Sequence, residues 1–260
     1  MEVSKRVTAE RLLLLGWSRA ILLQLAHPLI AAGVHEHSGF RDSPLAEAKR
    51  LHHTIGAMLQ ITFGDERASR QALNTIRDIH TRINGQLRTA VGPFAAGTRY
   101  SAEDPALLLW VHATLVDSMV LVYERLVSPL STAERDAYCA EAAWVAVDLG
   151  AVAADVPRTW EAMCRYFDGT LASPVITVGP EARELCRALL WPSLARMAPG
   201  SGWLNRLLTA ALLPPGVRDQ YGLSITPRQA RTAERLMRGI RAARRAVPAR
   251  AATWRISRPR

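Results

Sequence analysis

Cysteine is scarce in this sequence, and the few that occur exclude several kinds of site. Three cysteines lie far apart among 260 residues, at Cys139, Cys164 and Cys186. An odd, dispersed set provides neither a disulfide framework nor a cysteine-based metal knuckle, which need paired or closely spaced thiols. No C-x-x-C-H is present either, so any haem would be held non-covalently. This usage favours a reducing compartment, and we expect a cytoplasmic protein.

Short catalytic motifs are also missing. The sequence contains no H-E-x-x-H, no paired E-x-x-H, no G-x-S-x-G, no phosphate loop and no dinucleotide fingerprint. These absences argue against zinc proteases, ferritin-like dinuclear sites, nucleophile-elbow hydrolases and nucleotide-binding enzymes. A facial triad of two histidines and a carboxylate needs no local signature. Non-haem iron therefore stays open as an alternative.

The sequence has no long unbroken apolar run. The most apolar stretch, Leu12–Val34, is interrupted by Arg19, Gln24, His27 and Pro28. A membrane-spanning helix needs about 20 nearly uncharged residues, and a signal peptide needs an apolar run with a small-residue cleavage site. We therefore interpret this stretch as a buried core helix that kinks or stops at Pro28.

Strand-like alternation is nearly absent, and helical patterns follow one another along the chain. The run Val175–Val178 is too short to found a sheet. We expect one all-α domain over residues 1–260, a bundle of roughly eight to ten helices with a buried haem pocket. The expected helices are Glu10–Ala26, Leu45–Phe63, Ala68–Leu87, Pro105 to about Val127, Thr132 to about Gly150, Arg158–Asp168, Glu181–Met197, Trp203–Leu213 and Pro227 to about Ala246.

Acidic residues are rare in the last part of the chain. Up to Gly216 there are 21 basic and 21 acidic residues, whereas from Val217 onward there are 12 arginines and two acidic residues, Asp219 and Glu234. The formal charge of +10 therefore lies on the C-terminal helix and tail, at about 226–260. On this helix one side carries arginines, and these are Arg228, Arg231, Arg235, Arg238 and Arg245.

Three interpretations of this basic helix stay open. It is a solvated face on a helix docked to the core, a surface for an anionic membrane, or a surface for nucleic acid. The solvated face has the most weight, and of the two binding surfaces we favour peripheral contact with an anionic membrane. Nucleic acid is disfavoured because the tail has one bulky aromatic residue, Trp254, for stacking with bases.

Histidine is confined to the first 112 residues, where all seven occur. His80 falls within an apolar helical stripe formed by Leu73, Ile76, Ile83 and Leu87. His112 shares a helix face with Leu108, Leu115 and Met119. Burying an unpaired imidazole costs about 1–3 kcal/mol, so each must bond to a backbone carbonyl or bind a ligand. Two such histidines on separate helices indicate one shared pocket.

A third helical segment adds polar groups to this picture. Arg50, His53 and Thr54 stand at i, i+3 and i+4, so their side chains share one helix face. Glu36 lies between His35 and His37, after a run of small residues.

Six motifs in order carry a family resemblance. They are HPLIAAGVHEHS (27–38), R-x-x-x-T (50–54), FG (63–64), H-x-x-x-x-G (80–85), Y-x-A-x-D-P (100–105) and WVHATL (110–115). Together they resemble the MpaB-type oxygenase family, which includes the latex-clearing rubber oxygenases. In the rubber oxygenases this domain is all-helical, binds haem b and splits carbon–carbon double bonds with O2.

The resemblance implies roles for particular residues. His80 matches the axial histidine that binds the haem iron. Arg50 and Thr54 match pocket residues, and Arg50 would either pair with a haem propionate or order the distal side. His112 matches a further functional histidine. His53 stands where the rubber enzymes have a lysine, and we expect its neutral imidazole to reach the sixth position of the iron.

The expected function follows from this match. We expect a haem b-dependent oxygenase that takes an apolar small molecule, isoprenoid or otherwise alkene-containing, and O2. Glu36 would serve as a base toward an allylic proton. The alternatives are a non-haem iron oxygenase and a non-enzymatic helical module that binds anionic lipid or nucleic acid through its arginine-rich tail.

Overall fold

The computed structural model describes residues 2–37, 44–191 and 200–257, with side chains in the helix that begins at residue 44 described from residue 52 onward. Its α-helices are α1 (Glu2–Thr8), α2 (Trp17–Leu25), α3 (Pro28–His37), α4 (Pro44–Phe63), α5 (Glu66–His80), α6 (Pro105–Leu126), α7 (Thr132–Leu149), α8 (Trp160–Ala172), α9 (Pro180–Leu190), α10 (Ser201–Leu212), α11 (Pro215–Gln220), α12 (Pro227–Ala246) and α13 (Ala249–Ala252). Short 3-10 helices cover Arg11–Gly16 (η1) and Arg255–Ser257 (η3).

The all-α prediction is confirmed. Short helices such as α1, α11 and α13 take the number above the eight to ten expected.

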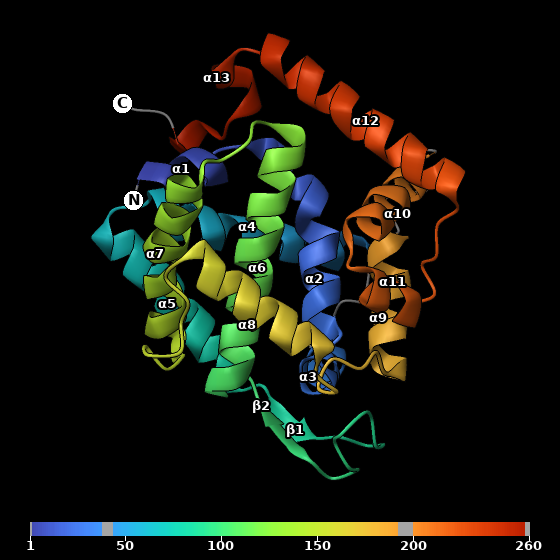
Figure 1. Ribbon diagram of the computed structural model, residues 1–260. Coiled ribbons are helices and arrows are strands. Elements are labelled where there is room, and N and C mark those ends of the chain that lie inside the picture. Colours follow the sequence, from blue (N-terminus) through green and yellow to red (C-terminus); the bar gives the residue numbers. More distant parts are fainter. Residues whose placement is uncertain (1, 38–43, 192–199, 258–260) are drawn as a thin grey trace.

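Helix α6 runs through the middle of the protein, between α7 and α2, with α8 in front of it and α12 across its end (Figure 1). It is long and apolar enough to cross a membrane, but 72% of its most apolar 18-residue window is buried inside the protein. Trp110 and Met119 lie in the core on different sides of it. The apolar residues of α6 are thus used in packing against the surrounding helices.

Local capping groups start and end several helices where the sequence predicts. The Asp104 carboxylate accepts a hydrogen bond from the Ala106 amide, with Pro105 as the first helical residue of α6. Ser131 and Thr226 each form a capping box, at the start of α7 and of α12. Gly150, with φ +119°, ends α7 in the left-handed conformation that glycine adopts without strain. These boundaries are confirmed.

The first apolar stretch is not one continuous helix. The expected helix Glu10–Ala26 begins as the 3-10 helix η1 and becomes α-helical only from Trp17. A methyl group on Gly16 would collide with the side chain of Val122 on α6, so glycine allows close approach at this junction. After α2 the chain bends by 109° into α3, as Pro28 predicts.

The expected helix Ala68–Leu87 is too long at its C-terminal end. Helix α5 ends at His80, and the chain enters a two-stranded antiparallel hairpin of β1 (Asn84–Gln86) and β2 (Arg99–Ser101). Ile83 and Leu87 therefore do not continue the helical stripe of His80. The expected helix Glu181–Met197 ends at Leu190 as α9, and residues 192–199 lie outside the described part of the chain.

The C-terminal segment is docked on the body of the protein. Ala233 and Met237 of α12 are buried in the hydrophobic cluster that also contains Met119 of α6. Arg244 donates two hydrogen bonds to the carboxylate of Glu10, at 2.8 and 2.6 Å. The Trp254 amide donates to the Ala9 carbonyl at 3.0 Å. This segment is therefore part of the domain and not a free tail.

The close contact at Gly16 makes a stability prediction. Gly16→Ala should lower the free energy of unfolding by about 1–3 kcal/mol, because the added methyl group meets Val122 in a packed core. Gly239→Ala, in the exposed interior of α12, should raise it by about 0.5–1 kcal/mol, because nothing lies within 4 Å of the added methyl group and alanine favours helix. Urea unfolding of both variants measures the two changes. Equal stability of Gly16→Ala and wild type would show that η1 has room to move away from α6.

Candidate functional site

His80 is the last residue of α5 and is partly buried. The Nδ1 atom of its ring is buried and has no hydrogen-bond partner. Its position in the last turn of a helix favours a positive charge, which is typically worth about 0.3–1 kcal/mol. Burial acts the other way and lowers the pKa of His80, while the charge of Glu103 raises it to a lesser degree. The net effect favours a neutral imidazole, which has a lone pair for a metal or a hydrogen-bond donor.

His112 lies on α6 and is 8% exposed. Its Nε2 atom is buried and has no hydrogen-bond partner. Burial lowers the pKa of His112 to about 4, so the ring is neutral at pH 7. Leu108 and Met119, which were predicted to share its face, are buried as well. An unpaired polar atom here costs about 1–3 kcal/mol, a deficit that a ligand would offset.

Several other buried polar groups around α6 have partners. Arg19 forms an ion pair with Asp117 at 2.6 Å and donates to the Leu212 carbonyl at 2.8 Å. The Trp110 indole N–H donates to the Leu23 carbonyl at 3.1 Å. The indole nitrogen of Trp144 on α7, in contrast, is buried without a partner, as the Nε2 atom of His112 is. The unpaired nitrogen of His112 is therefore available to a ligand.

The hairpin fixes the end of α5 to the start of α6. In its register Gly85 pairs with Tyr100, and the Ala102 amide donates to the Ile83 carbonyl at 2.9 Å. A methyl group on Gly85 would collide with the Tyr100 hydroxyl, which explains the need for glycine. The sequence motifs H-x-x-x-x-G and Y-x-A-x-D-P are therefore the two halves of one structure that holds His80 near α6.

The C-terminal end of α3 packs against this hairpin. A methyl group on Gly33 would contact Ile83 at 3.3 Å and Tyr100 at 3.5 Å. The Tyr100 hydroxyl donates to the Glu36 carboxylate, and Arg88 donates to the same carboxylate at 2.9 Å. The bond from Tyr100 is the largest influence on Glu36 and lowers the pKa of its carboxyl, burial opposes it, and Arg88 lowers the pKa further. Sequence reasoning noted Glu36 but missed its bond to Tyr100, because no local pattern joins residues 64 positions apart.

His27 is a third buried histidine, at the bend between α2 and α3. Its ring lies 5.3 Å from that of Phe94, and its Nδ1 atom accepts a hydrogen bond from the Leu29 amide at 3.3 Å. Burial lowers the pKa of His27 to about 4, against a smaller opposite effect of Asp104. This histidine has a structural partner, and it supports the bend that places α3 beside the hairpin.

The residues predicted on α4 lie on a helix with little cover. His53 and Thr54 are exposed, and the side chain of Arg50 lies outside the described residues. From residue 52 to the end of α4 no described residue is fully buried, although Ile55, Met58 and other apolar side chains occur there. The three consecutive exposed positions 52–54 span most of the helix circumference. The roles of Arg50, His53 and Thr54 stay predictions.

No group of three His, Cys, Asp or Glu side chains that could hold a metal ion occurs within residues 2–37, 44–191 and 200–257. Iron in haem needs only one axial nitrogen from the protein, because the macrocycle provides four more. His80 and His112 each have one buried ring nitrogen without a partner, and either nitrogen fits that requirement.

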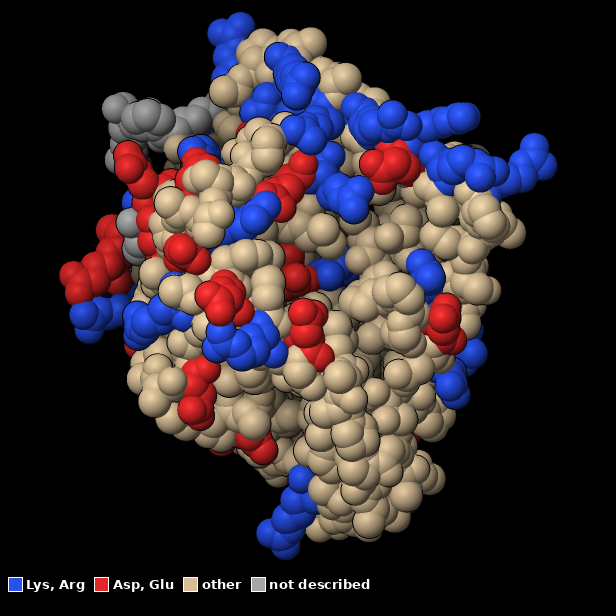
Figure 2. Space-filling model, viewed as in Figure 1, with Lys and Arg blue, Asp and Glu red and all other residues tan. Residues whose placement is uncertain are grey.

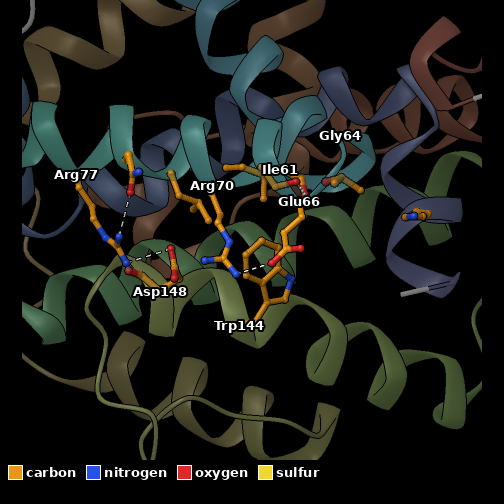
Figure 3. Close-up of a pocket in the computed structure, with 12 residues that line it drawn as sticks. Ile61, Gly64, Glu66, Arg70, Arg77, Trp144 and Asp148 are labelled. Carbon is orange, nitrogen blue, oxygen red and sulfur yellow. Dashed lines mark hydrogen bonds and ion pairs between the residues drawn. The ribbon is translucent and has the colours of Figure 1, made fainter.

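A separate cleft of about 560 Å³ lies between α4, α5 and α7, beside Lys5 of α1 (Figure 3). Its charged groups are largely paired, with Arg77 bonded to Asp148 at 3.1 Å and Arg70 to Glu66 at 2.5 Å. None of the site residues predicted from the sequence lines it. The cleft and the histidine site are therefore different places in the fold.

Comparison with known proteins identifies the family. The family model described as the catalytic domain of ER-bound oxygenase mpaB/B′ and rubber oxygenase matches residues 5–242. This chain belongs to that oxygenase family. The match extends from α1 into α12, so the family domain includes the whole arrangement of helices around α6.

The relatives of this oxygenase-family protein are mycobacterial. Uncharacterised proteins of Mycobacterium bovis and Mycobacterium tuberculosis are each 27% identical to it over 238 residues. The alignment covers 89% of this chain and 88% of each relative. No solved structure matches the chain. Membership in the oxygenase family supports an oxidoreductase and leaves the cofactor and the substrate to be inferred.

The buried ring of His112 makes a prediction about acid stability. In the unfolded chain its pKa returns to about 6.5, so between pH 6.5 and about 4 the unfolded state binds more protons than the folded state. Stability should therefore fall as the pH falls through this window, by at most about 1.4 kcal/mol per pH unit for this group. His112→Phe should remove that part of the slope, as measured by urea unfolding of protein without added haem.

The matched control is His52→Gln, which replaces an exposed imidazole on α4. Its stability should follow the pH dependence of the wild type. If His112→Phe and wild type lose stability equally between pH 6.5 and 4.5, the ring of His112 is accessible to protons in the folded state.

Proposed function

We propose that this protein is a haem b-dependent oxygenase that uses O2 to oxidise an apolar small molecule with an alkene, such as an isoprenoid. The observation that carries the proposal is the pair of imidazoles of His80 and His112, each with a buried ring nitrogen that lacks a partner. Family membership supports the reaction class. The neutral state of both rings at pH 7 supports a role in binding and not in ion pairing.

His80 would be the axial ligand of the haem iron. Its ring is kept neutral by burial, and the hairpin holds its backbone against the start of α6. When bound there, haem would supply an iron that activates O2. The contribution of the chain is to fix one imidazole in an apolar surrounding, where water does not compete for the ligand position.

His112 would form part of the wall of the same pocket. Its Nε2 atom can donate or accept one hydrogen bond, and at pH 7 it adds no charge. Because Leu108 and Met119 flank it, a polar substrate would lose its hydration without gaining partners. This surrounding favours a substrate that is apolar where it meets α6.

The polar face of α4 would complete the pocket on the opposite side. Arg50 would pair with a propionate or order the distal side, and His53 and Thr54 would offer an imidazole and a hydroxyl toward O2. Both His53 and Thr54 are exposed on α4. This assignment rests on the family pattern R-x-x-x-T.

Glu36 is held ionised by Tyr100 and Arg88. Two donors stabilise the carboxylate and make it a weaker base in this arrangement. To take a proton from an allylic carbon, Glu36 would first have to lose the bond from Tyr100. Its function in the described arrangement is to connect α3 with the hairpin that positions His80.

Loading with haem tests the proposal. Wild-type protein mixed with hemin should give a Soret band of a His-ligated haem, and His80→Ala should lose it while the helical circular dichroism persists. The reason is that an alanine offers no axial nitrogen, while removal of an unpaired buried imidazole leaves no new unsatisfied group. His112→Ala should retain haem, with a shifted Soret maximum and altered activity.

His52→Ala serves as the control for histidine removal in general, because its ring is exposed on α4. A full Soret band in His80→Ala, together with its loss in His112→Ala, would assign the axial ligand to α6. Wild-type protein that gives no Soret band with hemin, while binding Fe²⁺ in its place, would favour the non-haem alternative.

A further inference from the structure

The orientation of α12 on the protein is fixed by its apolar side. Ala233 and Met237 are buried, and Leu236 and Ile240 pack against the same hydrophobic cluster. These positions recur at three- and four-residue spacing and form one face of the helix. The opposite face of α12 therefore points into solvent along its whole length.

That outward face carries a row of arginines, which we term the arginine stripe. Its members are exposed and lie at helical spacing, and they are Arg228, Arg231, Arg235, Arg238 and Arg245. The residues between them on the same face, including Gly239 and Ala242, are small or uncharged. At 1.5 Å per residue the stripe is about 25 Å long. Figure 2 shows the basic side chains gathered along the α12 edge of the molecule.

The stripe is not neutralised by the described residues. Glu234, the acidic residue of α12, is bonded to Arg125 of α6 at 3.0 Å. Glu10 forms an ion pair with Arg244, on the side of α12 that packs against the rest of the protein. None of the five stripe arginines forms an ion pair with a described residue. The excess charge of the sequence is thus concentrated on one straight surface.

Two exposed apolar side chains come after the stripe in the sequence. Val247 is 39% exposed directly after α12, and Ile256 is 48% exposed in η3. The segment that carries them is held by the bond from the Trp254 amide to the Ala9 carbonyl and by Arg11, which lies 5.3 Å over the Trp254 ring. A rigid row of cations with an exposed aliphatic group, Val247, at its end matches the boundary between lipid headgroups and acyl chains.

We propose that the arginine stripe is a docking surface for an anionic lipid membrane. Five guanidinium groups on one line meet the phosphates of anionic lipids, while Val247, directly after α12, contacts the region below them. The body of the protein is electrically balanced, so the attraction acts through α12 and sets one orientation on the bilayer. This surface would bring the protein to the place where apolar molecules accumulate.

The observations favour lipid over nucleic acid. α12 is docked along its length on the body of the protein, so it cannot enter a major groove as a protruding recognition helix does. Trp254, the bulky aromatic residue of the segment, is half-buried beneath Arg11 and is not available for stacking with bases.

Vesicle sedimentation tests the proposal with the full chain. Wild-type protein should bind vesicles of phosphatidylcholine and phosphatidylglycerol in a two-to-one ratio, and should not bind vesicles of phosphatidylcholine alone. Each arginine near an anionic surface contributes about fivefold in affinity, so Arg228→Gln/Arg231→Gln/Arg235→Gln/Arg238→Gln should weaken binding by about a hundredfold or more. Binding should also decline as NaCl rises from about 0.1 M to about 0.5 M, because salt shortens the distance over which the charges of protein and lipid attract each other.

The matched control removes the same charge elsewhere. Arg67→Gln/Arg82→Gln/Arg99→Gln/Arg158→Gln replaces four exposed arginines of the body and should bind like the wild type. Equal weakening by the two quadruple variants would show that net charge, and not the stripe, is responsible, and would overturn the proposal. So would salt-insensitive binding, no binding to the anionic vesicles, or tighter binding to duplex DNA than to these vesicles.

Two further variants protect the test against misfolding. If the quadruple stripe variant loses its helical circular dichroism, the pairs Arg228→Gln/Arg231→Gln and Arg235→Gln/Arg238→Gln are measured separately, and each should weaken binding by at least about tenfold. Unchanged binding by both folded pairs would refute the stripe. The assay needs no haem, so its outcome is independent of the proposed oxygenase function.

Discussion

The burial of α6 on every side is the constraint on which the rest of the structure depends. A helix that is apolar all round must be covered all round, and no single neighbour can do this. Four separate hydrophobic clusters form around it, and each contains residues of α6, among them Leu107, Leu108, Trp110 and Met119. Helices α1, α2, α7, α8 and α12 all pack against α6, so a polar group on its buried positions is held away from water.

This constraint explains why the histidine site is where it is. A ring placed on α6 loses water whatever its neighbours are, and its charge is suppressed as a consequence. The same core gives Arg19 a carboxylate and a carbonyl, so it is able to satisfy buried polar groups. It leaves the Nε2 atom of His112 without a partner, and the proposed function gives that atom a role in the pocket.

Sequence patterns predicted those elements whose signals are local. The capping groups at Asp104, Ser131 and Thr226 lie within three residues of the amides they bind, and their helices begin as expected. The end of α5 was predicted wrongly because the pairing of Gly85 with Tyr100 competes with the helix, and this pairing is invisible to a helical stripe. The close approach of Gly16 to Val122, more than 100 residues away, is likewise invisible to a local pattern.

The same distinction applies to the candidate site. Burial of His112 could be predicted, because Leu108 and Met119 stand at helical spacing from it. His80 is partly buried although Ile83 and Leu87, half of its predicted stripe, lie outside the helix. The bond between Tyr100 and Glu36 could not, since it forms only when α3 and the hairpin meet. The exposure of His53 and Thr54 could not be predicted either. Helical spacing shows that residues share a face, but it does not show whether another element covers that face.

The antiparallel bridge between Glu10 and Thr253 has a consequence for the order in which the protein is assembled. Glu10 also holds Arg244, so the start of the apolar N-terminal stretch obtains its partners from residues synthesised more than 230 positions later. On the ribosome η1 and α2 therefore emerge with a leucine-rich surface whose final contacts do not yet exist. Contacts of such sequence separation are costly to close and slow folding. Until the C-terminal residues have been synthesised, the leucines of this segment stay exposed, and chaperones that bind apolar nascent segments would recognise them. In the folded domain most of these leucines are buried.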